Sequence, residues 1–408
     1  MKYLGAILVA GTIGIMCIVG IRGWIIMNEN KQNTSVQPTK APEKTTYTVL
    51  LLGYGGGNHD GAYLTDSMML VRADLKSKQI HMISLPRDIW IRVPTKSGAD
   101  FHIKLNALYQ LELFPKDFPD VKVPTNSSEK AGTLVKNAVS EITGISIDSL
   151  VAVDFQAFVK TIDTIGGIDV NITKSFEDAM YPIDGKEREY CGKEEDFRKI
   201  EPFISPPFNE DDRKKLLSEK PELDEFLRYA TVSPELAFPC RYEKLKFTAG
   251  KTHMDGETAL KYARSRHGIE DGGDFGRAAR QQQVLLALKE KLFSVSVLPK
   301  VLPLVNELKS KVTTDVSTDD IKKMIGEASS AGMYRFRSFV LSDQNYLQNS
   351  RSSGGQYILI SDDGLDKWTS VQQGITMFIN NITPTPSPTI GPSPTHKPTT
   401  TISPKKGS

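Results

Sequence analysis

The sequence has few cysteines and almost no net charge. Three of its 408 residues are cysteine, and the two outside the N-terminal apolar run, Cys191 and Cys240, have no histidine or cysteine neighbours at metal-ligand spacing. This argues against a cysteine-based metal centre. The formal charge is only +2, whereas a nucleic-acid-binding module has a basic excess or stripe. We therefore expect no nucleic-acid partner and no gene regulation through direct contact with DNA.

The same two cysteines leave two alternatives open. They form one disulfide, or they remain two thiols that never meet in the fold. A disulfide would be compatible with an oxidising compartment outside the cytoplasm.

The N-terminus indicates that compartment. Residues 3–21 are uncharged and mostly apolar, and after Arg22 the apolar run continues to Met27, which is long enough to cross a bilayer. Lys2 precedes the run, so the positive-inside tendency puts the C-terminal bulk outside. No small-x-small cleavage site is obvious before Met27, which favours an uncleaved anchor over a removed signal peptide. We expect a single-pass protein of the cell membrane, with a cytoplasmic stub and transmembrane helix in residues 1–29.

Beyond this anchor, strand and helix patterns alternate. Residues 30–46 are polar and without periodicity, which indicates a linker. From residue 47 on, apolar runs of strand length and amphipathic helical patterns predict an α/β fold, a three-layer α/β/α sandwich with a central mixed sheet. The expected strands are 46–53, 67–74, 79–86, 150–154, 167–172, 335–341 and 357–360. The expected helices are 104–113, 130–143, 155–165, 257–263, 366–380 and two that begin at Asp274 and Ser317.

Two segments differ from this alternation. Residues 174–245 are rich in charge and proline, so we interpret them as a surface insertion with a helix over 211–229. After residue 382 the chain is a Pro/Thr/Ser tail that cannot bury a core, and 383–408 is predicted to be disordered. The folded domain is therefore expected to span 47–382.

Charged side chains concentrate in residues 259–286, where arginines and glutamines surround a short Gly-rich loop. Arg264 and Arg266 lie where one predicted helix ends, and Asp274 is the expected N-cap of the next. Guanidinium groups bind phosphate oxygens through paired, charge-assisted hydrogen bonds, so the cluster predicts a site for a multiply charged anion such as pyrophosphate. The alternative is a set of surface ion pairs. The residues expected at the anion site are Arg264, Arg266, Asp274, Arg277, Arg280 and Gln281, with Arg277 and Gln281 one turn apart on one helix face.

Three earlier motifs carry further charged residues. A Gly-rich loop between two strands contains Asp60 and Asp66, and acids in such a place hold hard cations such as Mg²⁺, which shares oxygen ligands with substrate phosphates. The alternative is that they are turn or capping residues. Arg87 and Asp88 follow a strand. Lys104 stands at a helix start, where an ordinary solvated lysine is the alternative.

Taken in order, these segments resemble the LytR-CpsA-Psr family of cell-envelope proteins. The matching pieces are TDSMMLVRAD, ISLPRDIWI, KLNALY, FVKTIDTIGGIDVNI, ALKYARSRH and DFGRAARQQQV, and they cover most of residues 47–382. The resemblance implies a membrane-anchored protein with an α/β/α domain outside the cytoplasm. It also implies a phosphotransferase that moves an undecaprenyl-pyrophosphate-linked glycopolymer, such as teichoic acid or capsular polysaccharide, onto peptidoglycan and releases undecaprenyl phosphate.

The resemblance assigns roles to individual residues. Asp66 matches an acid of the site that holds Mg²⁺, and Asp274 matches an acid that orients the arginines. The expected catalytic residues are Asp66, Arg87 and Arg264, acting with Mg²⁺ on the pyrophosphate. The positions that match the surroundings of the pyrophosphate are Arg87, Lys104, Arg264, Arg266, Arg277 and Gln281.

Two positions depart from the family pattern. Gly55 stands where the family commonly has an aspartate, and Leu64 stands where it has an arginine two residues before the metal aspartate. Asp60 or His59 is the candidate replacement for the missing metal ligand. The insertion at 174–245 also lies outside the common pattern.

Alternatives remain for the lipid and for the activity. The resemblance places the polyprenyl tail between sheet and helices, and helices 155–165 and 284–293 are apolar enough to line a tunnel, with ordinary core packing as the alternative. For the activity, one alternative is a polyprenyl-pyrophosphate hydrolase that uses water as the acceptor. The other is a non-catalytic envelope-binding protein with a regulatory, transcriptional attenuator-like role.

Overall fold

The computed structural model describes residues 45–57, 61–123, 132–183, 185–205, 207–266, 268, 273–292, 312–316 and 334–382. The predicted anchor and linker up to residue 44, His59 and Asp60, the helix from Ser317, and the tail 383–408 lie outside these ranges. Within them, no helix is both long enough and apolar enough to cross a bilayer.

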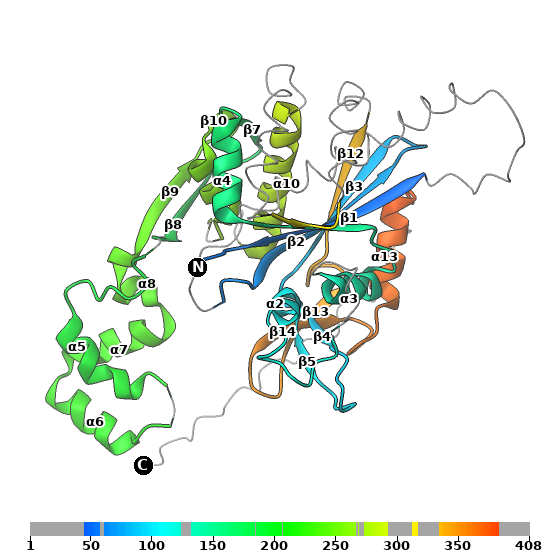
Figure 1. Ribbon diagram of the computed structural model, residues 1–408. Coiled ribbons are helices and arrows are strands. Elements are labelled where there is room, and N and C mark those ends of the chain that lie inside the picture. The colour runs from blue at the N-terminus through cyan, green and yellow to red at the C-terminus, as the bar shows by residue number, and fades with distance from the viewer. Residues whose placement is uncertain are drawn as a thin grey trace, which may run out of the picture.

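A mixed sheet of six strands forms the middle of the molecule (Figure 1). The strands are β1 (Thr46–Tyr54), β2 (Thr65–Asp74), β3 (Gln79–Leu85), β6 (Ser149–Asp154), β11 (Val312–Thr314) and β12 (Arg335–Val340). Their order across the sheet is β11-β6-β1-β2-β3-β12. β1 pairs in parallel with β6 and β3 in parallel with β12, whereas the other neighbours are antiparallel. The predicted mixed α/β fold with a central mixed sheet is confirmed.

Both faces of this sheet are buried. Successive side chains of a strand point to opposite faces, so a strand covered on both sides becomes apolar almost throughout. On β1 and β2, the side chains of Leu51, Met69 and Val71 enter the core on one face. Those of Leu50 and Leu70 enter the core on the other face. The continuous apolar runs of the sequence therefore reflect two separate cores.

Among the described residues, three helices cover the first face, α4 (Phe155–Thr164), α9 (Gly256–Arg264) and α10 (Gly273–Leu292). α9 packs closely on α4 at Gly256, where a Cβ atom would lie only 2.3 Å from the carbonyl oxygen of Val159. Only glycine permits this approach. The side chains of Phe158 in α4 and Leu288 in α10 are fully buried in this core. That burial is what ordinary core packing predicts for these helices.

In the part of the chain that the structure describes, the second face is covered by three further helices and two hairpins. The helix predicted over 104–113 begins late, because Lys104 ends β5 and pairs there with Trp90 of β4. A short 3₁₀ turn, η1 (Leu105–Ala107), leads into the α-helix. The helices are α2 (Leu108–Leu113), α3 (Thr133–Thr143) and α13 (Thr369–Ile379), and the hairpins are β4 (Trp90–Arg92) with β5 (His102–Lys104) and β13 (Leu347–Arg351) with β14 (Tyr357–Ser361).

The strand predicted at 167–172 does not join the central sheet. It is β7 (Ile168–Ile172), and it pairs with β10 (Gly250–Met254) in a small ribbon of its own. Gly167, just before β7, has φ +75 and lies so close to His253 that a Cβ atom would come within 2.4 Å of its ring nitrogen. The turn into β7 therefore requires glycine.

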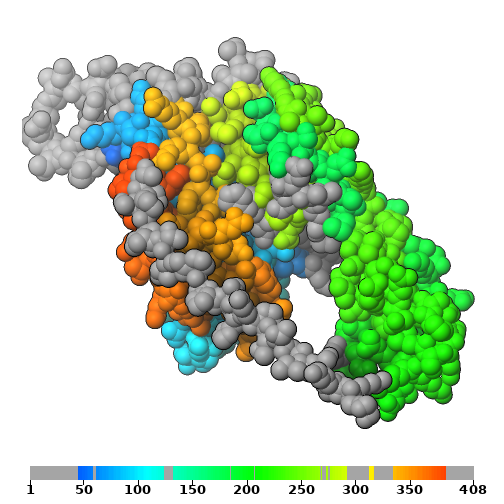
Figure 2. All heavy atoms as spheres, turned by 180° about the vertical axis from the view of Figure 1, so that it is seen from behind, coloured from blue at the N-terminus to red at the C-terminus, as the bar shows by residue number. Residues whose placement is uncertain are grey.

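Residues 176–247 form an arm that projects from the body, shown in green in Figure 2. Two strands, β8 and β9, make its base, and helices make its tip. The helix predicted over 211–229 is two helices, because Pro221 cannot continue the first of them. The elements are β8 (Phe176–Pro182), α5 (Glu194–Ile200), η2 (Glu201–Phe203), α6 (Glu210–Glu219), α7 (Glu222–Val232), α8 (Pro234–Ala237), η3 (Pro239–Arg241) and β9 (Tyr242–Phe247).

The tip of the arm has a small core of its own. A disulfide joins Cys191 to Cys240 and closes this tip, so the alternative of two separate thiols is wrong. Because so small a core contributes little burial, the disulfide supplies a substantial share of the stability of the tip. The buried side chains of the core are Ile200, Leu223, Phe226, Leu227, Ala237 and Phe238.

Candidate active site

The predicted site residues from the strands meet at one edge of the central sheet. β2 runs antiparallel to both of its neighbours, so its first residues lie beside the last residues of β1 and β3. The register pairs Met68 with Leu85, which brings Asp66 near Arg87, just beyond β3. We refer to Asp66, Arg87, Asp88 and Lys104 as the strand half of the site.

The strand half is a chain of ion pairs. Arg87 donates a hydrogen bond from Nη1 to the carboxylate of Asp66. Its Nε lies 3.4 Å from Oδ2 of Asp88, and Nζ of Lys104 lies 2.6 Å from Oδ1 of the same carboxylate. Asp88 is only 5% exposed, and two cations compensate for the burial of its charge. Asp88 thus fixes the positions of Arg87 and Lys104, the two side chains of the strand half that are predicted to bind phosphate.

Asp88 is a site residue that the sequence motifs do not mark. The available signal was its place directly after Arg87 at a strand end. This position becomes informative only once the structure places Lys104, on the neighbouring hairpin, next to Asp88. Nζ of Lys104 donates a hydrogen bond to the Asp88 carboxylate, so Lys104 is not an ordinary solvated lysine.

The second group of predicted residues comes from α9, α10 and the segment between them. Arg277 and Gln281 both lie in α10, one turn apart as predicted, and both are buried to about 5% exposure. Ser67 of β2 donates a hydrogen bond to Oε1 of Gln281 at 2.7 Å, and Gln282 donates to Ser84 of β3 at 3.2 Å. These two bonds fix the middle of α10 over the beginning of β2 and the end of β3. We refer to Arg264, Arg266, Arg277, Arg280 and Gln281 as the helix half.

α10 begins at Gly273, one residue before the predicted N-cap Asp274. The side chain of Asp274 lies outside the described part of the chain, so its expected role in orienting the arginines stays a prediction.

Two arginines of the helix half lie against aromatic rings. The guanidinium of Arg264 is 5.1 Å from the ring centre of Phe155 and 5.5 Å from that of Tyr181. The guanidinium of Arg280 is 4.6 Å from the ring of Phe176 and donates to the backbone carbonyl of Ser265. Such cation–π contacts gain strength when water is excluded, and Arg280 is only 1% exposed. Because Arg280 donates to the carbonyl of Ser265, it supports the turn that carries Arg264 and Arg266 from the buried side.

A buried aspartate holds the backbone of that turn. Asp178 is fully buried, and its Oδ2 accepts hydrogen bonds from Oγ of Ser265 at 2.7 Å and from the backbone N–H of Arg266 at 3.1 Å. Its Oδ1 accepts from the N–H of Met180. Phe176, Asp178 and Tyr181 all belong to β8, the first strand of the arm. The segment interpreted as a surface insertion therefore also positions the arginines, which its polar composition did not reveal.

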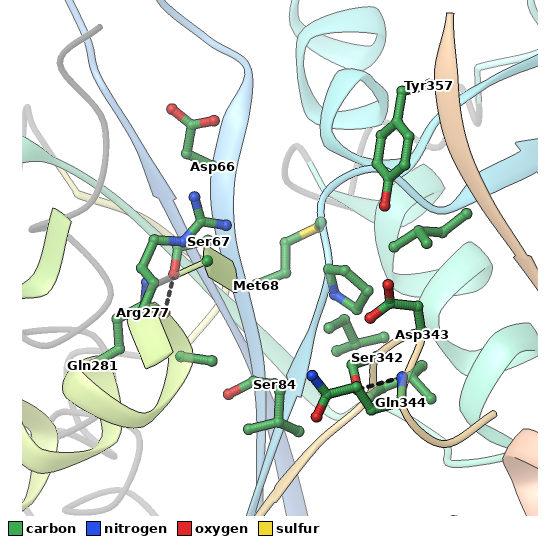
Figure 3. Close-up of a pocket in the computed structure, with 17 residues that line it drawn as sticks. Asp66, Ser67, Met68, Ser84, Arg277, Gln281, Ser342, Asp343, Gln344 and Tyr357 are labelled. Carbon is green, nitrogen blue, oxygen red and sulfur yellow. Dashed lines mark hydrogen bonds between the residues drawn. The ribbon is translucent and has the colours of Figure 1, made fainter. Parts of the chain in front are cut away.

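A polar cavity of about 290 Å³ opens between the start of α10 and the segment after β12. Figure 3 shows Asp66, Arg277 and Gln281 on one side of it, with Tyr357 and Asp343 on the opposite side. Three predicted site residues thus line one cavity, and they come from both halves of the site. The opposite wall is formed by Val340, Leu341, Ser342, Asp343, Gln344, Tyr357 and Leu359, none of which the sequence singled out.

Tyrosines gather at the end of β1, close to the strand half. The ring of Tyr54 lies 5.8 Å from that of Tyr63 and 5.6 Å from that of Tyr109. Burial raises the pKa of the Tyr54 phenol, and Tyr109 and Asp154 raise it further. Tyr54 is therefore protonated at neutral pH and cannot serve as a base there.

The donor set for the expected metal is small among the described residues. Asp66 offers one carboxylate at the cavity, and no group of three or more histidine, cysteine, aspartate or glutamate side chains is placed for a metal in the described ranges. Gly55 follows β1 without a carboxylate, and nearby Asp154 caps α4 by accepting from the N–H of Ala157. Mg²⁺ commonly binds through one or two carboxylates plus substrate phosphates, so Asp66 fits such a site as a single protein ligand.

Comparison with known proteins gives the family. The sequence profile of the LytR_cpsA_psr family matches residues 25–373. The chain belongs to this family. A relative in Bacillus subtilis (strain 168), the polyisoprenyl-teichoic acid–peptidoglycan teichoic acid transferase TagV, is 25% identical over 332 residues, which are 77% of this chain and 64% of the relative. Biofilm regulatory protein A of Streptococcus mutans is 23% identical over 334 residues, which are 80% of this chain and 62% of that protein.

The match therefore spans a little less than two thirds of the length of these two family members. Among solved structures, protein gbs0355 from Streptococcus agalactiae superimposes with a TM-score of 0.50 at 20% identity, over 82% of this chain and 88% of that one. This similarity shows a shared fold. The first of these relatives is named as a transferase and the second as a regulatory protein. The sequence leaves both kinds of function open for this chain.

Proposed function

We propose that this protein is a phosphotransferase that attaches an undecaprenyl-pyrophosphate-linked anionic glycopolymer, of the teichoic acid or capsular polysaccharide type, to peptidoglycan. The observation that carries the proposal is the cavity in which Arg277 and Gln281 of the helix half lie beside Asp66 of the strand half. Fixed guanidinium groups suit a pyrophosphate, and phosphoryl transfer mainly requires positioning and charge neutralisation. The transferase name of the Bacillus subtilis relative supports the same activity.

The proposed place of action is the outer side of the cell membrane. The apolar run near the N-terminus would serve as a single-pass anchor, with the folded domain outside the cytoplasm. The disulfide between Cys191 and Cys240 supports this placement, because disulfides persist in oxidising compartments. The anchor would also keep the site near its lipid-linked substrate.

In the proposed reaction, an acceptor sugar hydroxyl attacks the phosphorus next to the polymer. The new bond joins the sugar oxygen to that phosphorus, the bond from this phosphorus to the bridging oxygen breaks, and undecaprenyl phosphate leaves with that oxygen. The hydroxyl proton goes to a carboxylate of the cavity, for which Asp66 is our candidate. The pyrophosphate would contact Arg264, Arg266, Arg277, Gln281, Arg87 and Lys104, while Arg280 and Asp274 would hold these groups in place.

Asp66, together with Asp60, would hold Mg²⁺. When bound, the metal would neutralise charge on the phosphate oxygens. Asp60→Ala tests the contribution of Asp60 to Mg²⁺ binding. We expect this substitution to lower the affinity for Mg²⁺, measured by titration calorimetry. An unchanged affinity would remove Asp60 from the site and leave Asp66 as the proposed protein ligand.

The function is tested with full-length protein in lipid nanodiscs, a labelled polyprenyl-pyrophosphate-linked polymer and peptidoglycan as acceptor. We expect label on the glycan and release of polyprenyl phosphate. In Arg87→Ala and Arg264→Ala, turnover should fall on the order of a hundredfold, since each lost charge-assisted contact costs about 1.5–3 kcal/mol. Arg335→Ala is the matched control, because Arg335 is exposed at the start of β12, the end of that strand opposite the cavity.

Each alternative gives a different result in this experiment. Release of polyprenyl phosphate without label on the glycan would identify a hydrolase. Binding of the donor with no turnover would favour the regulatory role that the name of the Streptococcus mutans relative suggests. Circular dichroism of each variant separates loss of function from loss of fold.

A further inference from the structure

The two walls of the cavity differ in charge. One wall carries Arg277, Gln281 and the Arg87-paired carboxylate of Asp66. The opposite wall carries the hydroxyl of Ser342, the carboxylate of Asp343, the amide of Gln344 and the phenol of Tyr357, and its described lining includes no lysine or arginine. We refer to residues 340–344 with Tyr357 and Leu359 as the acceptor wall, for the reason given below.

A carboxylate without a neighbouring cation on its own wall would repel phosphate, so the acceptor wall does not suit the donor. The same groups suit a sugar. Carboxylate and amide oxygens accept hydrogen bonds from hydroxyls, and an aromatic ring packs against the apolar face of a sugar ring. We propose that the acceptor wall binds the glycan of peptidoglycan that receives the polymer, with Asp343 and Tyr357 as its main contacts. This inference rests on the proposed function.

Hydrogen bonds hold these two contacts together. Asn349 donates from Nδ2 to Oδ2 of Asp343 at 3.0 Å, and Oη of Tyr357 donates to Oδ1 of the same Asn349 at 2.5 Å. Tyr357 is 45% exposed, so its ring is accessible to a ligand. Because one asparagine bridges both side chains, the carboxylate and the ring have a fixed relative position before any glycan binds.

The turn that carries Asp343 is also fixed. Asn345 accepts from the backbone N–H of Ser342 at 3.0 Å and donates to the carbonyl of Val340 at 2.8 Å. This asparagine closes the turn directly after β12, so the carboxylate is presented at the end of a strand of the central sheet. A wall anchored in this way can position a ligand rather than merely contact it.

The acceptor wall is joined to the phosphate side by backbone. The N–H of Leu359 in β14 donates to the carbonyl of Asp88 at 2.9 Å, and Asp88 holds Arg87 and Lys104. The hairpin that carries Tyr357 is therefore fixed relative to the strand half. A glycan hydroxyl held by the acceptor wall would face a phosphorus bound at Arg277 on the opposite wall, which is the arrangement that the transfer requires.

The experiment measures donor and acceptor binding separately. Full-length protein in nanodiscs is titrated with soluble, uncrosslinked peptidoglycan glycan strands and, in parallel, with a polyprenyl diphosphate. We expect Asp343→Asn and Tyr357→Leu to weaken glycan binding about tenfold each while changing the diphosphate affinity less than about twofold. Arg277→Ala should show the reverse pattern. Asp362→Asn is the matched control, because Asp362 is an exposed carboxylate of the same C-terminal segment outside the cavity.

Tyr357→Phe distinguishes the ring from its hydroxyl. The phenylalanine keeps the surface for stacking and loses the bond to Asn349, so glycan affinity should fall less than in Tyr357→Leu. Circular dichroism and the retained diphosphate affinity show that each variant is folded.

Each outcome decides the inference. Glycan affinity that is undetectable in the wild type, or unchanged in both Asp343→Asn and Tyr357→Leu, would overturn it. Loss of diphosphate affinity in these variants would assign the wall to the donor instead. If the wild type binds glycan through this wall but transfers no polymer, the proposed function fails while the glycan site stands. If both variants transfer polymer at the wild-type rate, the glycan site fails while the proposed function stands.

Discussion

The helix half and the strand half hold their cations by different means. In the helix half, Arg280 is buried against the ring of Phe176 and the carbonyl of Ser265, and Asp178 fixes the neighbouring backbone. In the strand half, Arg87 and Lys104 keep more than a quarter of their side chains exposed and are held by carboxylates. Arg280 thus depends on burial, and Arg87 and Lys104 depend on ion pairs.

This difference predicts different sensitivities. A buried guanidinium on an aromatic ring is little screened by salt, whereas partly exposed ion pairs weaken as ionic strength rises. The support that Arg280 gives to the helix half should therefore respond mainly to changes in packing. The strand half should respond to changes in charge, and the four predictions below run from the largest expected effect to the smallest.

Arg280→Met should have the largest effect, because it breaks the support of the helix half. The carbonyl of Ser265 loses a buried charged donor, and the ring of Phe176 loses its cation. We expect the free energy of unfolding to fall by about 2–3 kcal/mol, measured by urea denaturation. The diphosphate affinity should fall as well, since the turn with Arg264 and Arg266 loses its support. Unfolding like that of the wild type, and like that of the exposed control Arg335→Met, would contradict the burial argument.

Asp88→Asn should have an intermediate effect on the strand half. The amide no longer attracts Arg87 and Lys104 as a carboxylate does, so both cations lose their fixed position near the phosphorus. We expect turnover to fall roughly tenfold, about 1.4 kcal/mol, in the transfer assay. The difference in turnover between the wild type and Asp88→Asn should become smaller at high salt, because salt also weakens the ion pairs of Asp88 in the wild type. Asp100→Asn, which changes an exposed carboxylate paired with Arg92, serves as the control and should leave turnover unchanged.

Acid should weaken the scaffold of the strand half through β3. Burial lowers the pKa of His81 below its usual 6.5, and the positive charges of Arg337 and Arg72 lower it further, while Asp74 opposes them. The unfolded chain therefore binds the proton more readily than the folded one. The stability from neutral His81 is complete above about pH 6.5 and is lost as the pH falls below it.

This pH dependence is measured as the free energy of unfolding between about pH 7.5 and 5.5. His81→Leu should make the free energy of unfolding depend less on pH, because leucine cannot be protonated beside the ring of Phe378. An equal slope in wild type and variant would assign the acid sensitivity to other groups.

Replacing both Cys191 and Cys240 by serine should have the smallest effect on the site. The tip of the arm loses a cross-link worth roughly 2–5 kcal/mol in small domains and should become sensitive to protease. β8 remains paired with β9 at the base of the arm, for example Phe176 with Phe247, so the arginines keep their support. We expect the diphosphate affinity to stay within about twofold of the wild type. A large loss of affinity would show that the tip, and not only the base, supports the helix half.

Much of the framework could be predicted from local sequence. β1, β2 and β3 are apolar runs bounded by glycines or turn residues, and the expected N-cap Asp274 predicts the helix that the structure shows as α10. Such signals depend only on neighbours within a few residues. The exact bounds of an element depend on tertiary contacts, as at Lys104, where strand pairing with Trp90 overrides the helical pattern.

The missed residues have a common cause. Asp178, Asp88 and Asp343 are ordinary polar residues in their local sequences, and their roles follow from partners 88, 16 and 6 positions away in the chain. The insertion looked like a polar surface because most of it is exposed. Nevertheless β8, the first strand of the insertion, places aromatic rings against Arg264 and Arg280 and a carboxylate against the backbone of Arg266. These contacts become visible only when β8 packs beside α9 and α10.

The sequence by itself determined which chemistry is present: arginines at a helix exit and a helix start, an aspartate at a strand entry, and motifs of one family. These features are local, because helix periodicity, strand length and glycine turns involve only nearby residues. The tertiary structure decided which of these groups line one cavity and which carboxylate or ring holds Arg87, Arg264 and Arg280. It also decided that the segment after β12 forms the opposite wall, because the parallel pairing of β12 with β3 brings residues far apart in the chain to the same edge of the sheet.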